Sequence, residues 1–496
     1  MEILDLTLSK VLEAREHRAL LRTNIAKSGF DSLSLTLNIP GYPKSNKLLS
    51  YFFSNVLEDL VIYLQANRIY IDKKNEIWTT DEAGDFYLVP LTLNKNTELN
   101  DLKQLTEFFE EKHKLGRLID IDIFDKYAKP VSSGKEKPCY FCGKYSAISC
   151  MRNKRHSYQE IRNKIFDDIS LLLEDKTKEN LINKISGLAQ RALLYEISIS
   201  NKPGLVCFEG PGAHKDMNFF SFLNSTTALS PFFKEFCTLG YDYTGTLKSV
   251  LPKIREIGLR AEKAMFSTTD QANTHKGIIF LFGISLFAST KIISENTYFS
   301  EKIFQETVKK IGKNLVKNEL DPLDDPKTHG EEVFKQYGKI GAGIRQEIET
   351  GLATIFQTAI PYLSENLKPE IYKDQIQLQK ILLHGLLLIM SKNNDTNILY
   401  RSNLEKLNHI KELSKRSILD PKAYDLLCDF CNKNRLSPGG SADLLAISLF
   451  LHFIKELAAK KSIDPATKIG INSTNKLFIS SKNKINNLNF IKKNRV

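Results

Sequence analysis

The spacing of hydrophobic residues changes once along this chain, and that change constrains the fold more than any other feature. In the first part, 33–39 and 118–124 alternate apolar and polar residues with a period of two, and 68–71 is rich in β-prone residues. Alternation of this kind is typical of strands with one buried face. From about residue 157 to 460, apolar residues recur at helical spacing instead. We therefore predict an N-terminal α/β (α+β) domain followed by a larger all-α domain.

A charged run, Glu174 to Glu179, marks the expected domain boundary. A chain of 496 residues exceeds what one hydrophobic core usually organises. We predict domains at 1–172 and 175–462, followed by a basic tail at 463–496. The tail is rich in Asn, Ser and Lys, which predicts weak order, with a nucleic-acid-binding arm as the alternative.

Cysteine content and hydropathy bear on the compartment. Seven cysteines and no signal peptide favour a reducing one, and the cytoplasm is the default. The longest apolar stretches, 277–288, 381–390 and 444–454, are shorter than a membrane span and predict buried core helices. The net charge of +12 admits nucleic acid, an acidic protein or phosphorylated small molecules as partners.

Three blocks in the second half combine catalytic residue types with glycine inside otherwise helical surroundings. They are Gly212-Ala-His-Lys-Asp-Met217, Asn273-Thr-His-Lys-Gly277 and Ser437-Pro-Gly-Gly-Ser-Ala-Asp443. Glycine and proline are unfavourable in helices, so their repeated use here indicates close backbone approach and polar groups. We predict that the three blocks form one active site.

In the first domain, Asp120 and Asp122 lie two residues apart on a predicted strand and so project from the same face. Paired carboxylates of this kind can hold Mg²⁺ together with substrate phosphates. The alternative is an edge strand with two solvated aspartates.

Two further segments could meet phosphate: the strand and turn that end at Lys44, and a helix whose face carries Arg15. Glu13-Ala-Arg-Glu-His-Arg18, Leu37-Asn-Ile-Pro-Gly-Tyr-Pro-Lys44 and Leu115-Gly-Arg-Leu-Ile-Asp-Ile-Asp122 together resemble the holo-citrate lyase synthases over roughly residues 5 to 165. The resemblance implies a nucleotidyltransferase-like domain. In it, a serine of the citrate lyase acyl carrier subunit attacks a triphosphoribosyl donor and releases pyrophosphate. It also implies Mg²⁺ on the two aspartates and phosphate contacts from Arg15, Lys44 and Arg117.

The segment that follows the predicted strand at 118–124 contains Cys139, Cys142, Cys150 and His156. These are the ligand types and the initial spacing of a structural Zn²⁺ site. Reduced, partly buried cysteines are the alternative. A second Cys-x-x-Cys, Cys428 and Cys431, lies in a predicted helix and is interpreted as core packing.

From Lys202-Pro-Gly-Leu-Val206 to Ala446, the polar-glycine blocks resemble the triphosphoribosyl-dephospho-CoA synthases. In that family the ribose 2'-hydroxyl of dephospho-CoA displaces adenine from ATP. The reaction needs a base, a proton donor for adenine, and cations on the triphosphate. Further matched blocks are Arg255-Glu-Ile-Gly258, Thr328-His-Gly330, Gly343-Ile-Arg-Gln-Glu347 and Asp395-Thr-Asn397.

The residue types in these blocks suggest roles. We expect catalytic groups at His214, Asp216, His275, Glu347 and Asp443, and a magnesium ligand at Asp395. We expect substrate contacts from Lys215, Asn273, Lys276, Arg345, Arg401, Ser437, Gly439 and Gly440. His275 could instead be a core or helix-cap histidine, and Asp443 could be a helix N-cap.

Two segments depart from the family. Cys207-Phe208 stands where polar residues are common, and Asp270-Gln-Ala272 stands where two glycines and a valine are usual. The resemblance as a whole predicts a cytoplasmic bifunctional enzyme that makes and attaches the citrate lyase prosthetic group. The alternatives are the analogous malonate decarboxylase pathway and a zinc-containing nucleic-acid-binding protein.

Overall fold

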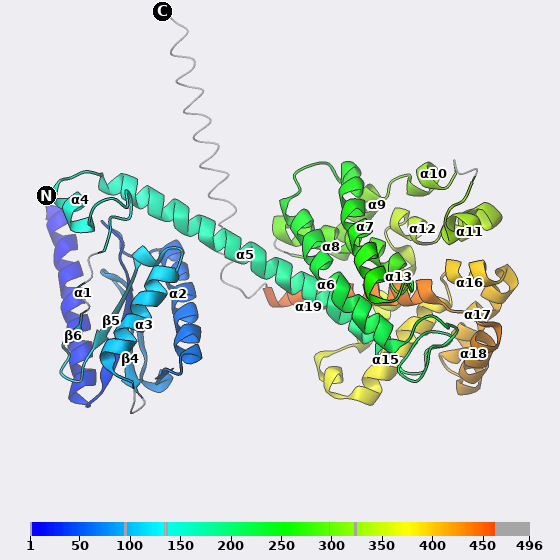
Figure 1. Cartoon of the computed structure of the whole chain (residues 1–496), viewed down its shortest axis with the longest axis horizontal. Coiled ribbons are helices and arrows are strands. Elements are labelled where there is room, and N and C mark those ends of the chain that lie inside the picture. Colours follow the sequence, from blue (N-terminus) through cyan, green and yellow to red (C-terminus); the bar gives the residue numbers. More distant parts are fainter. Residues whose placement is uncertain are drawn as a thin grey trace, which may run out of the picture. The chain divides into compact units, whose positions relative to one another are not determined.

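The computed structural model describes residues 2–93, 97–132, 134, 137–296, 298–321 and 325–461. They form two compact units, which divide between Thr177 and Lys178 (Figure 1). The predicted tail at 463–496 lies outside the described residues.

Unit 1 is an antiparallel sheet with helices on both faces. Its elements are α1 (Glu2–Lys27), β1 (Asp31–Leu37), α2 (Lys47–Ala66), β2 (Tyr70–Ile71), β3 (Ile77–Asp81), β4 (Gly84–Thr92), α3 (Leu99–Lys112), β5 (Ile119–Phe124), β6 (Pro130–Val131), α4 (Ala147–Arg152) and the first part of α5 (Tyr158–Ile197), with short 3-10 turns at Lys73–Asn75 and Gly116–Leu118. The strand order is β2-β4-β1-β5-β6, and β3 also pairs with β4. The predicted strands are thus confirmed, with 68–71 reduced to two residues and 33–39 shifted to 31–37.

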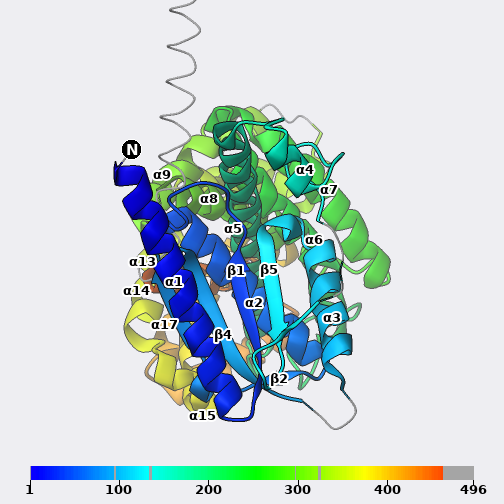
Figure 2. The same ribbon diagram turned by 90° about the vertical axis from the view of Figure 1, so that its left-hand side faces the viewer.

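The register of β1 and β5 separates two chemically different faces. Leu35 pairs with Ile121, and this apolar face packs on α2 and α3. Thr36 pairs with Asp120 and Ser34 with Asp122, which places the polar side chains on the opposite face. Figure 2 shows α1 running across the strands on one side of the sheet. The polar face of the sheet therefore lies opposite the arginines of α1.

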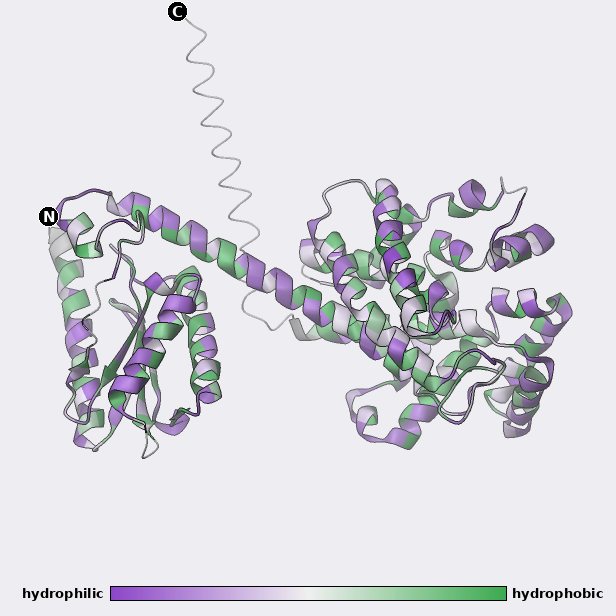
Figure 3. Ribbon diagram, in the orientation of Figure 1, coloured by the Kyte–Doolittle hydropathy of each residue, from purple (hydrophilic) through white to green (hydrophobic). Residues whose placement is uncertain are grey.

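Helix α5 carries the chain from unit 1 into unit 2. The charged run Glu174 to Glu179 lies inside this continuous helix, so the expected break is not a loop. Lys176 pairs with Asp59 of unit 1 at 2.6 Å, and Lys178 pairs with Asp242 of unit 2 at 2.7 Å. Apolar and polar residues are interspersed along the whole length of the helix (Figure 3). Its two ends therefore contribute apolar side chains to two separate cores.

Unit 2 is helical throughout its described residues. After α5 come α6 (Phe219–Asp242), α7 (Leu251–Thr268), α8 (Lys276–Asn296), α9 (Glu301–Ile311), α10 (Leu315–Glu319), α11 (His329–Tyr337), α12 (Gly343–Glu349), α13 (Ala353–Gln357), α14 (Ala359–Asn366), α15 (Gln375–Met390), α16 (Thr396–Arg401), α17 (Leu404–Ser417), α18 (Pro421–Asn434) and α19 (Gly439–Lys461), with 3-10 turns at Leu247–Ser249, Gly338–Gly341 and Pro369–Lys373. The expected all-α architecture is confirmed for these residues.

Helix α8 is a long, apolar and mostly buried helix of this unit. Among the described helices it alone is long and apolar enough to cross a membrane. Most of it is buried inside unit 2, where it packs against α6, α7 and α19. This is the packing expected of the core helix of a globular domain.

Candidate functional sites

A cavity of about 350 Å³ in unit 1 lies between α1 and the polar face of the sheet. Asp120 and Asp122 line it, as do Arg15 of α1 and Lys44 of the turn after β1. The structure therefore brings together four of the five residues predicted for this site. Arg18 and Arg22, one and two helical turns after Arg15, complete its basic wall.

The two aspartates have different electrostatic surroundings. Lys137 Nζ lies 2.8 Å from Asp120 Oδ1 and 3.0 Å from Glu110 Oε2. Burial, followed by the charge of Asp120, raises the pKa of Asp122. Burial also lowers the pKa of Arg22, an effect that the charge of Asp122 opposes. Two adjacent carboxylates that repel each other would be relieved by a cation between them, so this oxygen donor set fits Mg²⁺.

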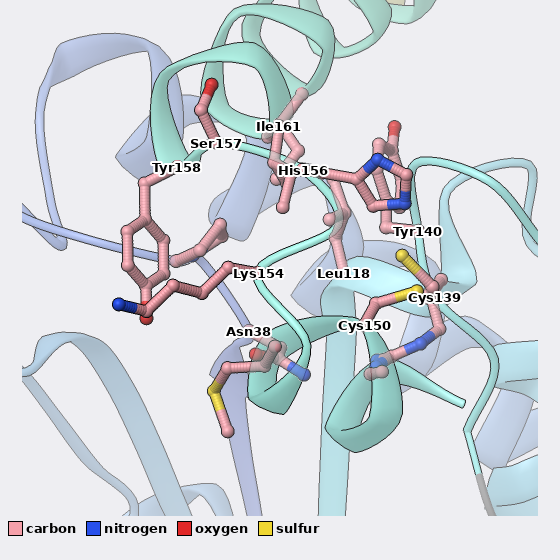
Figure 4. A pocket seen from close by; sticks show the side chains of 15 residues that line it. Asn38, Leu118, Cys139, Tyr140, Cys150, Lys154, His156, Ser157, Tyr158 and Ile161 are labelled. Atoms are coloured by element: carbon pink, nitrogen blue, oxygen red, sulfur yellow. The ribbon is translucent and has the colours of Figure 1, made fainter. Parts of the chain in front are cut away.

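Arg117 lies beside this cavity rather than in it. Its Nε donates a hydrogen bond to the carbonyl of Pro138 at 2.6 Å, and it lines a neighbouring cavity of about 600 Å³. Asn38 lines both cavities, so they adjoin each other at this residue. Figure 4 shows the second cavity, with Cys139, Cys150 and His156 on one side of it and Tyr158 on the other. The predicted cysteine–histidine group is thus assembled at its edge.

Unit 2 contains a cavity of about 630 Å³ lined by segments far apart in the sequence. They are parts of α7, the start of α8, the start of α11, Ile344 and Arg345 of α12, and Asn397 of α16. Among the predicted residues, Asn273, Lys276 and Arg345 line it directly. The positive ends of α8 and α11 both reach this cavity, an arrangement that suits an anionic ligand.

Acidic side chains hold the cations at the cavity wall. Glu319 accepts a bond from Arg345 Nε at 3.0 Å and also pairs with Arg255. Lys276 Nζ lies 3.4 Å from Glu262. Glu319 belongs to none of the matched blocks, and the sequence analysis missed it. Only the fold shows that it joins arginines from α7 and α12.

Asp443, from the third polar-glycine block, lies behind Gly277, a residue that lines this cavity. It is half-buried, and a Cβ built on Gly277 would lie 2.5 Å from its Oδ2. Burial raises the pKa of Asp443 well above its ordinary value, and Glu196 and Asp395 raise it further. The second and third blocks therefore lie against each other at this point.

His214 belongs to a second polar group. Its Nε2 lies 2.8 Å from Ser437 Oγ, and its Nδ1 lies 3.5 Å from Arg401 and 3.9 Å from Asp216. Burial, followed by the charge of Arg401, lowers the pKa of His214. The first and third blocks are thus joined here. Lys215 next to it is exposed.

Three predicted residues are instead engaged within the protein. His275 is buried, its Nδ1 lies 2.6 Å from Ser225 Oγ, and burial lowers its pKa to about 3. Glu347 Oε1 accepts a hydrogen bond from Thr354 Oγ1 at 2.5 Å. Asp395 is buried and accepts bonds from the Asn397 amide and from the amide and hydroxyl of Ser441. These contacts favour structural roles for all three.

The last predicted contacts lie at the start of α19. A Cβ on Gly439 would stand 2.7 Å from Asn397 Nδ2, and one on Gly440 would stand 3.3 Å from Asp395. Both glycines therefore permit close packing against α16. Asp270 and Gln271, where the family usually has glycines, have φ values of 50° and 64°. The loop keeps the left-handed backbone that glycine would adopt most easily.

Comparison with known proteins gives the same two-part division. Residues 6–170 match the family described as apo-citrate lyase phosphoribosyl-dephospho-CoA transferase, CitX. Residues 182–462 match the family described as ATP:dephospho-CoA triphosphoribosyl transferase, CitG. The Protein CitXG of Haemophilus influenzae is 33% identical over 474 residues, which cover 90% of this chain and 96% of that protein. The Protein CitXG of Leuconostoc mesenteroides subsp. cremoris is 31% identical over 476 residues, 90% of this chain and 97% of that protein.

A protein matching the second unit alone is also similar. A probable 2-(5''-triphosphoribosyl)-3'-dephosphocoenzyme-A synthase from Photobacterium profundum is 35% identical over 298 residues, which are 58% of this chain and 92% of that protein. Two units with these matches define a two-domain transferase that acts on dephospho-CoA in citrate lyase prosthetic-group synthesis. The chain belongs to the CitXG family, in which a CitX and a CitG domain are joined. The resemblance predicted from the sequence is confirmed.

Proposed function

We propose that unit 2 catalyses the reaction of ATP with dephospho-CoA to give 2'-(5''-triphosphoribosyl)-3'-dephospho-CoA and adenine. The supporting observation is the cavity lined by Lys276, Arg345 and two helix N-termini, with the carboxylate of Asp443 directly behind its lining residue Gly277. Cations and N-termini would hold the triphosphate. Asp443 in its ionised form would accept the proton of the attacking 2'-hydroxyl, and the burial that raises its pKa would make it a stronger base.

Unit 1 then transfers phosphoribosyl-dephospho-CoA to a serine of the citrate lyase acyl carrier protein, with release of pyrophosphate. Arg15, Arg22 and Lys44 would bind the phosphates, and Asp120 and Asp122 would hold Mg²⁺. When bound, Mg²⁺ would neutralise charge on the phosphates. The adjoining cavity, lined by Asn38, Arg117 and Tyr158, would take the dephospho-CoA portion of the donor.

The protein would work in the cytoplasm. All seven cysteines are free thiols, as a reducing compartment requires. Joining both activities in one chain would raise the local concentration of the intermediate near the domain that consumes it. The nucleic-acid-binding alternative explains neither cavity of unit 1 nor that of unit 2.

The test follows adenine by chromatography after the protein is mixed with ATP, dephospho-CoA and Mg²⁺. Adenine release that requires dephospho-CoA, and that falls at least about 100-fold in Asp443→Asn, would support the synthase reaction. Asp425→Asn is the matched control because Asp425 is exposed on α18. Adenine formation without dephospho-CoA, or none from a folded protein, would contradict the proposal. Addition of the apo acyl carrier should then release pyrophosphate.

A further inference from the structure

Four metal-ligand side chains in unit 1 converge outside the acidic cavity. Cys139, Cys142, Cys150 and His156 each offer one ligand atom, and these atoms all lie within 4.8 Å of one another. They come from three consecutive pieces of chain: a tight turn, helix α4 and the segment before α5. No other group of three or more potential ligands is found among the described residues. Cys428 and Cys431 have the same Cys-x-x-Cys spacing but belong to no such group of ligands among these residues.

The backbone of the turn is arranged around the first two cysteines. The Cys139 amide donates to the Tyr145 carbonyl at 2.7 Å, and the Gly143 amide donates to the Cys139 carbonyl at 2.9 Å. Gly143 has a φ of 64°, which allows the chain to reverse immediately after Cys142. The Cys142 sulfur lies 3.6 Å from the Cys150 sulfur. The turn therefore holds Cys139 and Cys142 close together through its own backbone hydrogen bonds.

The fourth donor has an unsatisfied atom. His156 Nε2 is buried and has no hydrogen-bond partner among the described residues. A buried polar nitrogen without a partner is costly unless an ion or a water satisfies it. In Figure 4 the imidazole of His156 lies beside the sulfurs of Cys139 and Cys150. The ring therefore lies where a metal ligand should be.

The segment that carries these ligands buries few apolar side chains. Between residues 138 and 157 the only buried apolar side chains are Cys139 and Cys150, whereas Phe141, Tyr145, Ile148 and Met151 are exposed. A segment with so small a core usually needs a disulfide or a metal. All of these cysteines are free, and Cys142 and Cys150 are 3.6 Å apart at sulfur, beyond a disulfide bond.

We propose that Cys139, Cys142, Cys150 and His156 bind one Zn²⁺ in a closed, structural site. Three thiolates and one imidazole are a preferred tetrahedral donor set for zinc, and four protein ligands leave no open position for substrate. Cys139, Cys150 and His156 also line the 600 Å³ cavity, so the metal would fix one wall of that cavity. The site would thus shape a substrate cavity without taking part in chemistry.

Metal analysis of the full chain, purified under reducing conditions without added chelator, tests the proposal directly. We expect about one zinc per chain, and thiolate-to-cobalt charge-transfer bands with intense tetrahedral bands after exchange for Co²⁺. Cys142→Ser and His156→Ala should lose the metal, whereas His156→Cys, which keeps a donor, should retain it. Cys428→Ser, from the other Cys-x-x-Cys, should keep full zinc.

Trp78 provides a readout that does not depend on activity. It is the only tryptophan, and it belongs to β3 of unit 1. A strong chelator should lower the unfolding temperature seen by its fluorescence, and added zinc should restore it. Well under about 0.1 zinc per chain together with no cobalt–thiolate bands would overturn the proposal. So would equal zinc content in the wild type and in Cys142→Ser, or a Cys142–Cys150 disulfide in the reduced preparation.

Discussion

The carboxylate of Asp443 occupies the space that a side chain at residue 277 would need. A Cβ at Gly277 would stand 2.5 Å from Asp443 Oδ2 and 3.0 Å from Ile344 Cδ1. Gly277, Ile344 and Asp443 lie near the starts of α8, α12 and α19, so the absence of a side chain at Gly277 lets these three helices approach one another closely. The contact joins two sequence blocks that are far apart in the chain and places an acidic group beside the cavity wall.

Gly277→Ala should therefore damage the site more than the fold. The new methyl group would displace the Asp443 carboxylate, and we expect adenine release to fall at least about 100-fold because small misplacements of reacting groups are costly. Alanine is a better helix former than glycine, so α8 itself should not be weakened. Gly187→Ala is the control, since a Cβ there has nothing within 4 Å; it should stabilise α5 by about 0.5–1 kcal/mol. Unchanged adenine release in Gly277→Ala would show that the position of Asp443 is unimportant.

Asp122→Asn should separate the two activities. Loss of one carboxylate from the acidic pair should reduce transfer to the acyl carrier at least about 100-fold, because Mg²⁺ would lose a ligand. Adenine release by unit 2 should be unchanged. Asp101→Asn, at an exposed aspartate of α3, should affect neither reaction. Parallel assays of pyrophosphate and adenine make the comparison, and equal losses in both would contradict the assignment.

Asp395 should prove structural. Its carboxylate caps α16 through Asn397 and holds the start of α19 through Ser441. Asp395→Ala should lower the free energy of unfolding of unit 2 by roughly 2–4 kcal/mol, since it removes a cap and leaves buried donors unpaired. Urea unfolding followed by helical circular dichroism measures this loss. A fully stable Asp395→Ala that requires more Mg²⁺ would instead support the magnesium role predicted from the sequence.

His275 should make the stability of unit 2 depend on pH. Burial lowers its folded-state pKa from 6.5 to about 3, so the unfolded chain takes up a proton first as the pH falls. Its contribution is therefore fully present above about pH 6.5 and is lost between pH 6.5 and 3, at up to about 1.4 kcal/mol per pH unit. His275→Asn should reduce this slope by about one proton. His409→Asn, at an exposed histidine of the same unit, is the control. Equal slopes in the wild type and in His275→Asn would contradict the prediction.

Gln271 should carry backbone strain. Its φ of 64° is unfavourable for a residue with a Cβ. Gln271→Gly should raise the free energy of unfolding by up to about 1 kcal/mol, and Gln271→Ala, which keeps the Cβ, should give no gain. Thermal unfolding followed by circular dichroism distinguishes them. A gain in Gln271→Ala alone would mean that the side chain, not the backbone, is strained.

Local sequence patterns predicted much of this protein. Alternation in 118–124 placed Asp120 and Asp122 on one face because side chains on a strand alternate with a period of two. The Cys-x-x-Cys turn and its following donors indicated the ligand types of a zinc site, with reduced cysteines as the alternative, and the structure shows that the four side chains converge. The order of the polar-glycine blocks identified the family, and the switch in periodicity separated the sheet from the helical unit.

Only the tertiary structure decided which predicted residues face a cavity. His275 and Lys276 are neighbours, yet the first is buried against Ser225 and the second lines the cavity, because a helix turns successive side chains in different directions. The sequence predicted functional roles for both Asp395 and Asp443. In the structure, the amide and hydroxyl of Ser441 in α19 donate hydrogen bonds to Asp395, whereas Asp443 is half-buried beside the charges of Glu196 and Asp395. Glu319, which joins two arginines at the cavity wall, carried no local signal at all. Residue type and order follow from the chain, whereas burial, hydrogen-bond satisfaction and long-range approach depend on how the helices pack.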